Sequence, residues 1–138
     1  MSQHQVKLTI KNYTSEPLVF QNSWSEYGQG VNFSDVPASS DVEWLIYRSN
    51  LTVGCSGYMV FNHKTMSKVT VAFSNPLWGE NRINVKMNEP NEKSAWDEMV
   101  SHYDKPMIIT QDGFKCQFSN TIGDDISYAT VEFWELQG

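Results

Sequence analysis

Residues 67–87 read SKVTVAFSNPLWGENRINVKM, and this stretch contains two strand patterns on either side of a short break. Apolar and polar residues alternate over 67–74 and again over 82–87, which is typical of strands with one buried face. A proline and a glycine interrupt the pattern between them, and the break carries the large apolar residues Leu77 and Trp78. Because loop tips are usually polar, this pair either folds back onto the protein or is offered to something outside it.

Alternating patterns recur on both sides of this stretch, at intervals of about ten residues, with turn residues between them. The sequence predicts further strands over residues 6–12, 18–24, 41–48, 55–62, 107–110, 114–120 and 128–136, and a brief extended segment over 31–33. Asp112-Gly113 is a strong signal for a tight hairpin turn. Many short strands with one late helix predict a mainly β protein, an antiparallel β-sandwich flanked by one or two short helices.

One segment has helical periodicity. Its apolar residues follow the spacing i, i+3, i+4 and i+7, which places them on one face of a helix. They are Trp96, Met99, Val100 and Tyr103. An asparagine before this stripe is a suitable N-cap, and a proline follows it. We therefore expect a helix that begins near Glu92 and ends after Tyr103.

Length and composition indicate one globular domain over residues 1–138, with 40% hydrophobic and 13% aromatic residues. The net charge of −6 and the pI of 4.9 disfavour binding to nucleic acid and bulk adsorption to anionic membranes. The N-terminal residues lack the pattern of a signal peptide, and no stretch approaches the roughly 18 apolar residues of a membrane span. We expect a soluble protein, cytoplasmic or released by a non-classical route, that can act at membranes.

The sequence contains no constellation typical of an enzyme or of a metal site. The histidines His4, His63 and His102 are scattered, and Cys55 and Cys116 are far apart in the chain. The two cysteines can pair only if the fold brings them together, and free thiols are favoured without an export signal. Adjacent aspartates at 124–125 fit a solvated turn better than a calcium site. We predict a non-enzymatic protein with no cofactor and no metal.

Two motifs resemble the centre of a known superfamily. The first is Gly54-Cys55-Ser56-Gly57, which runs into an apolar strand, and the second is VTVAFSNP over Val69–Pro76. Together with a late helix that ends in Tyr103, they resemble the actinoporin-like proteins, a superfamily that also contains the fungal fruit-body lectins. The resemblance covers residues 5–136, and FSNP is its most specific part. It implies a β-sandwich that binds phosphocholine of a sphingomyelin-type membrane, as in the actinoporins, or a small glycan, as in the lectins.

The resemblance also implies a position for the ligand. The pocket residues carried over in this way are Gly54, Ser56, Ser74, Pro76, Trp96 and Tyr103. The membrane contact would be formed by Leu77 and Trp78. Aromatic faces hold a quaternary ammonium, hydroxyls and N–H groups hold its phosphate, and a sugar uses the same residue types. These residue types therefore do not determine whether the ligand is a lipid headgroup or a glycan.

Several of these residues also have a purely structural explanation. Gly54 can serve a tight turn or a bulge, and Ser74 can satisfy the backbone at a strand end. Tyr103 can pack the helix against a sheet, and Trp78 can fold onto the edge of the sandwich. The tryptophans within strand patterns are expected to be structural.

The sequence departs from the actinoporins in three ways. Actinoporins begin with a long amphipathic segment that becomes the pore wall, whereas the first strand pattern here starts by Val6. The aromatic cluster after the proline is reduced to Trp78, and the actinoporins are usually basic. These departures favour a recognition module. Two alternatives stay open: a component of a pore-forming cytolysin that requires a partner or another segment, and a structural or protein-interaction sandwich in which Leu77 and Trp78 form a homo-oligomer contact.

Overall fold

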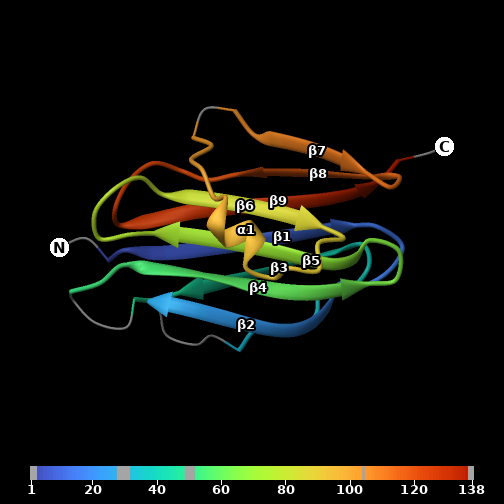
Figure 1. Cartoon of the computed structure of the whole chain (residues 1–138), viewed down its shortest axis with the longest axis horizontal. Coiled ribbons are helices and arrows are strands. Elements are labelled where there is room, and N and C mark those ends of the chain that lie inside the picture. The colour runs from blue at the N-terminus through green and yellow to red at the C-terminus, as the bar shows by residue number, and fades with distance from the viewer. Residues whose placement is uncertain (1–2, 28–31, 49–51, 104, 137–138) are drawn as a thin grey trace.

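The structure is a computed structural model that describes residues 3–27, 32–48, 52–103 and 105–136. In this part of the chain, two β-sheets pack face to face, and one short helix lies on the outside of one of them (Figure 1). The elements are β1 (Gln5–Tyr13), β2 (Val19–Tyr27), β3 (Ser40–Ile46), β4 (Cys55–His63), β5 (Ser67–Asn75), β6 (Arg82–Met87), α1 (Ser94–Asp97), β7 (Met107–Gln111), β8 (Phe114–Ser119) and β9 (Ile126–Glu135). The predicted mainly β sandwich is confirmed.

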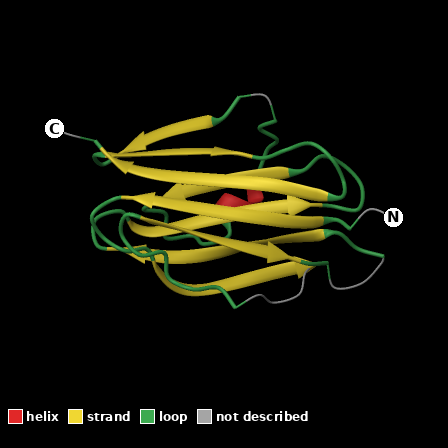
Figure 2. Cartoon of the chain, turned by 180° about the vertical axis from the view of Figure 1, so that it is seen from behind, coloured by secondary structure: helices red, strands yellow, loops and turns green. Residues whose placement is uncertain are grey.

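The strands form a five-stranded sheet in the order β3-β1-β9-β8-β7 and a four-stranded sheet in the order β2-β4-β5-β6. Every strand pair is antiparallel except β1 and β9, which are parallel from Gln5↔Ile126 to Tyr13↔Trp134. This parallel pair is the one exception in the predicted antiparallel sandwich, among the strands described. A parallel pair needs a long connection, and here nearly the whole chain lies between the two strands. Seen from behind, the five-stranded sheet is not covered by the helix (Figure 2).

The core lies between the sheets and follows the alternation in the sequence. In β1, Val6, Leu8 and Ile10 are buried and the residues between them are half-buried. The central strand β5 differs, because its residues are buried continuously from Val69 to Asn75. One face of β5 packs into the core, and the α1 segment covers part of the other. The outer face of β5, which α1 partly covers, belongs to the sheet that carries the candidate site.

The predicted helix over residues 92–103 is wrong in length, since only Ser94–Asp97 is helical. The chain then joins the edge of β6: the Ile83 N–H donates to the Val100 carbonyl at 2.9 Å, and the Val100 N–H donates back at 3.4 Å. A backbone that bonds to a strand edge cannot continue an α-helix. The apolar residues do have helical spacing, but the pairing of the Val100 backbone with β6 prevents a helix at this point.

Three smaller points complete the comparison with the sequence. Cys55 and Cys116 are both free and buried, and burial raises the pKa of Cys55 to about 12. In the segment predicted as extended at 31–33, Val31 lies outside the described residues, while Asn32 and Phe33 belong to no strand. No helix in the described part of the chain is long and apolar enough to cross a membrane.

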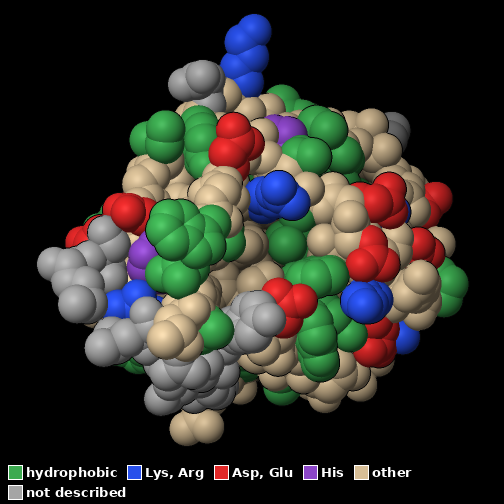
Figure 3. Space-filling model, turned by 60° about the vertical axis from the view of Figure 1, so that its left-hand side comes forward, with side chains coloured by type: hydrophobic (Ala, Val, Ile, Leu, Met, Phe, Trp, Pro, Cys, Tyr) green, Lys and Arg blue, Asp and Glu red, His purple; other side chains and the backbone are tan. Residues whose placement is uncertain are grey.

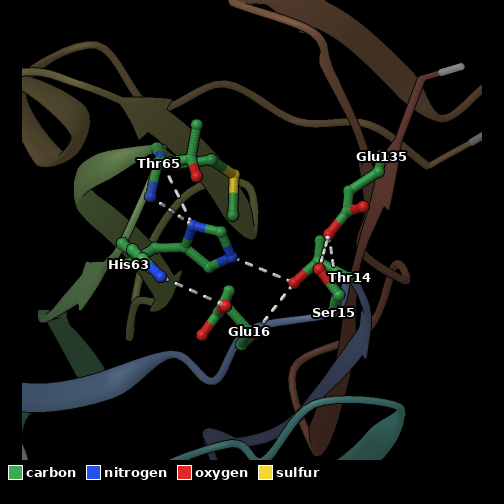
Figure 4. Close-up of polar contacts among 8 residues, drawn as sticks. Thr14, Ser15, Glu16, His63, Thr65 and Glu135 are labelled. Carbon is green, nitrogen blue, oxygen red and sulfur yellow. Dashed lines mark hydrogen bonds and ion pairs between the residues drawn. The ribbon is translucent and has the colours of Figure 1, made fainter.

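A buried histidine connects the β4–β5 turn to the end of β1 (Figure 4). The backbone N–H groups of Thr65 and Met66 both donate to Nδ1 of His63 at 3.1 Å. Nδ1 is therefore an acceptor, and the proton on Nε2 is donated to Thr14 Oγ1 at 3.0 Å. Burial lowers the pKa of His63, while Glu135 and Glu16 act more weakly in the opposite direction. The fold thus holds this imidazole neutral.

We expect the free energy of unfolding to fall as the pH drops below 6.5. Below this pH, which is the ordinary pKa of histidine, the unfolded chain binds a proton at His63 that the folded chain resists. The loss is at most about 1.4 kcal/mol per pH unit for one such group. Urea unfolding at a series of pH values measures it.

The matched variant is His63→Asn, which keeps an acceptor near Nδ1 and cannot titrate. Its unfolding free energy should depend less on pH, with a residual slope from His102, whose pKa burial also lowers. An unchanged slope in this variant would contradict the role given to His63.

Candidate functional site

Three polar side chains lie abreast on the outer face of the four-stranded sheet. Ser56 of β4 pairs with Ser74 of β5, which in turn pairs with Arg82 of β6. Residues directly opposite one another in a sheet point to the same face, so these side chains form one row across three strands. Two of them are hydroxyls and the third is a guanidinium. Such a row can donate hydrogen bonds to a single anionic group.

The row lies on the wall of a pocket of about 550 Å³. The pocket opens at the end of the sandwich where β4 and β6 begin and β5 ends. The face shown in Figure 3 has a hollow there, with hydrophobic, basic and acidic side chains around it. The lining residues are Glu26, Thr52, Val53, Gly54, Cys55, Ser56, Ser74, Pro76, Leu77, Trp78, Arg82, Trp96, Asp97 and Met99.

Gly54 shapes one side of the pocket by letting two backbones touch. A Cβ atom at this position would lie 2.4 Å from the Asn75 carbonyl oxygen and 2.5 Å from the Leu77 nitrogen. These distances are far shorter than a carbon can make, so only glycine fits. The role of Gly54 is close approach of the chain to the segment that carries Pro76. This explains the glycine physically and leaves no side chain for a ligand to contact.

Trp96 forms another side of the pocket and is held by its neighbours. Its Nε1 donates to Ser56 Oγ at 2.8 Å, which leaves the hydroxyl proton of Ser56 free for another acceptor. The Trp96 ring meets Trp24 edge-on at 5.3 Å, and the Lys93 ammonium lies 5.4 Å from its centroid. The ring is therefore fixed in place and already accepts one cation from the chain itself.

The polar groups of the pocket wall carry opposite charges. Within the described residues, Arg82 makes no ion pair, and no group bonds to Ser74 Oγ. Asp97 and Glu26 place carboxylates on the same pocket. An exposed guanidinium and carboxylates beside apolar residues suit a small ligand with both a negative and a positive group.

The apolar break in the opening stretch forms the rim of the pocket. Trp78 is 86% exposed, and Leu77 is half-buried beside it. Trp78 therefore does not fold back onto the sandwich. Large exposed aromatic residues of this kind commonly mark a contact surface.

Tyr103 does not line this pocket, although the resemblance places it there. Its hydroxyl accepts a hydrogen bond from the Asn81 backbone N–H at 2.7 Å. The Asn81 side chain donates in turn to the carbonyls of Thr121 and Gly123. Tyr103 is thus bonded to the segment before β6, and Asn81 connects that segment to the loop before β9. The shortened helix accounts for this, because after Val100 the chain leaves the surface of the sheet beside the pocket.

The structure brings together the other predicted residues and adds some that the sequence did not indicate. Gly54, Ser56, Ser74, Pro76 and Trp96 line one pocket with Leu77 and Trp78. Sequence reasoning missed the charged residues Arg82, Asp97 and Glu26. A signal for Arg82 existed, since it begins β6 in phase with the polar residues of the outer face. No signal marked the carboxylates. The described residues contain no cluster of His, Cys, Asp or Glu that could hold a metal ion.

Comparison with known proteins identifies the fold. No protein-family model and no curated protein sequence matches the chain. The solved structure of the lipid-binding protein Nakanori matches with a TM-score of 0.77 and 13% identity, over 96% of this chain and 71% of that one. A lectin from Xerocomus chrysenteron matches with a TM-score of 0.62 and 13% identity, over 97% and 99%. RahU protein matches with a TM-score of 0.55 and 14% identity, over 97% and 96%.

The chain therefore shares the fold of these solved structures, which include a lipid-binding protein and a lectin, as the resemblance of its motifs implies. At these identities the likeness defines the architecture, and the chemistry of the pocket has to be argued from this chain's own residues.

We expect Gly54→Ala to destabilise the fold by roughly 1–3 kcal/mol, as overpacking of a close contact usually does. The added methyl group would push against the backbone at Asn75 and Leu77, which has to shift. Urea unfolding of the variant and the parent measures the difference. Equal stability would show that the close approach at Gly54 is not a constraint on the pocket.

Proposed function

We propose that this protein is a non-enzymatic recognition module that binds a phosphocholine-type lipid headgroup at a membrane surface. The observation that carries the proposal is the row of Ser56, Ser74 and Arg82 beneath an exposed apolar rim. The lipid-binding protein among the structural neighbours has the same fold, which supports the same class of ligand.

The phosphate of the headgroup binds at the row. Arg82 offers a planar set of N–H donors that suits phosphate oxygens, and it has no other ion pair among the described residues. Ser74 and Ser56 each have a hydroxyl proton to donate beside it. Hydrogen bonds to an ionised group are about twice as strong as neutral ones, so this row contributes most of the affinity.

The ammonium end of the headgroup lies toward Asp97 and Trp96. A carboxylate attracts the positive charge without needing a hydrogen bond, and the apolar wall accepts the methyl groups. The Lys93 ammonium lies 5.9 Å from the Trp24 ring centroid and 5.4 Å from that of Trp96, which supports a cation site at these rings. Binding of the ligand's own ammonium would compete with this lysine.

The rim inserts into the membrane interface. Trp78, at 86% exposure, and Leu77 beside it stand at the mouth of the pocket. Tryptophan is favoured at the boundary between headgroups and acyl chains, because its ring is apolar and its N–H is polar. The rim therefore adds affinity for a vesicle that a free headgroup does not receive.

A glycan is the second candidate, because a lectin shares the fold and a sugar can also use the serines and the aromatic residues. The free guanidinium of Arg82 favours the phosphate, since an uncharged sugar gains less from it. Binding to a glycan array without binding to choline-lipid vesicles would decide for the sugar.

We expect Arg82→Gln to weaken binding to sphingomyelin-containing vesicles by roughly ten- to a hundredfold, the range for loss of a hydrogen bond to a charged group. Ser74→Ala should weaken it by several-fold, because one neutral donor is lost. Vesicle sedimentation measures both. The matched control is Lys11→Gln, which removes a positive charge from the other sheet and should bind like the parent. Equal losses in Arg82→Gln and Lys11→Gln would mean that bulk charge, and not the pocket, governs binding.

We expect Trp78→Ser to distinguish the contribution of the rim to binding from that of the pocket. The variant should lose most of its affinity for vesicles while it binds soluble phosphocholine like the parent, because only the vesicle contacts the rim. Titration of each variant with phosphocholine by NMR, beside vesicle sedimentation, checks this. Equal vesicle binding by Trp78→Ser would remove the membrane contact from the proposal. Release of a trapped dye by the protein alone would instead favour the pore-forming alternative.

A further inference from the structure

The strand β7 is an open edge of the five-stranded sheet. In the described chain it pairs with β8 on one side and lies at the end of the sheet order. Its sequence, MIITQ, contains no charged residue and no proline, and its pairing with β8 shows no register shift. Unprotected strand edges attract other strands, and proteins usually cover them, bend them or place charges on them.

The other three sheet edges in the described chain are protected in one of these ways. β3 carries the charged residues Asp41 and Glu43. β2 contains irregularities between Phe20 and Asn22 and between Ser25 and Tyr27, which bend the strand. β6 is bonded to the backbone of Val100. β7 has none of these protections.

The tight turn after β7 determines which backbone groups face outward. Asp112 and Gly113 have φ values of 52° and 84°, as a two-residue hairpin turn requires. In such a hairpin, Gln111 and Phe114 exchange hydrogen bonds, and so does every second pair along the strands. Ile108 and Thr110 are at the alternate positions. Their N–H and C=O groups therefore point to the open edge, and no turn, loop or side chain of the described chain bonds to them.

We propose that β7 is the docking site for β7 of a second copy of this chain, paired antiparallel about a two-fold axis at Ile109. With this centre, Ile108 of each copy lies opposite Thr110 of the other, so the outward-facing groups meet one another. Each such pair exchanges two backbone hydrogen bonds. In this register both outward-facing residues of each copy are paired within the strand.

Two further observations select a second copy as the partner. In the same register, Lys105 of one copy lies next to the Asp112-Gly113 turn of the other, so opposite charges flank both ends of the paired strands. Pairing also covers apolar side chains, since Met107 is 43% exposed and Ile108 is 52% exposed. This interface lies apart from the candidate pocket and does not depend on what binds there.

Charged substitutions on the edge test the proposal. The parent protein should have twice the chain mass of 15.8 kDa in sedimentation equilibrium, and the double variant Ile108→Lys with Thr110→Lys should show a twofold lower mass. In the dimer this variant places like charges directly opposite one another. The control is Ile122→Lys, at an exposed loop position, which should remain a dimer. A monomeric parent, or a double variant that stays dimeric, would overturn the proposal.

A cross-link tests the register without charging the edge. At the two-fold axis the Cα atoms of the two Ile109 residues would be about 4.5 Å apart, a distance that a disulfide spans. Ile109→Cys should therefore form a covalent dimer under mild oxidation, whereas Ile122→Cys should not. The native cysteines are buried and should not interfere. Failure of the Ile109→Cys chains to cross-link, with circular dichroism like that of the parent, would reject this register.

Discussion

The contact between Gly54 and the backbone of residues 75–77 is the constraint on which the site depends. A hydrogen in place of a side chain lets the start of β4 lie directly against the end of β5. The same segment is held from the opposite side, because Asn75 Nδ2 donates to the Gln5 carbonyl at 2.8 Å. His4 Nδ1 also lies 3.1 Å from the Pro76 carbonyl oxygen. Since both sheets fix this segment, the pocket and its rim are rigidly placed relative to the core.

Most of the fold could be predicted from the alternation of side chains, because that alternation records which face of each strand is buried. The sequence could not indicate that β1 and β9 are parallel, since strand direction depends on which strands meet and not on their own pattern. The helix prediction failed for a related reason. The apolar residues from Trp96 to Tyr103 have helical spacing, but the unpaired edge of β6 offers the Val100 backbone a partner outside a helix.

The site was predictable where it depends on local contacts. Gly54, Ser56, Ser74 and Pro76 meet because β4 and β5 form a hairpin whose register follows from its short turn. Arg82 was missed because motif likeness draws attention to residues shared with other proteins, while this arginine becomes significant only through its place beside Ser74. Tyr103 is the opposite case. It fits the motif, but its hydroxyl accepts a hydrogen bond from the Asn81 backbone N–H, and the residue does not line the pocket.

The two proposed surfaces have a geometric consequence when they are taken together. The pocket lies where β4 and β6 begin. Figure 1 shows that both strands begin at the same end of the sandwich. An antiparallel pairing of β7 strands joins the two five-stranded sheets and reverses the strand direction between the copies. It therefore places the two pockets, which lie on the four-stranded sheets, at opposite ends of the dimer. While Trp78 of one copy faces a membrane, Trp78 of the other faces away from it. Such a dimer is suited to joining two membrane surfaces, and not to binding one surface through both of its sites. A rigid two-fold assembly gains avidity only where both sites can reach the same surface at once.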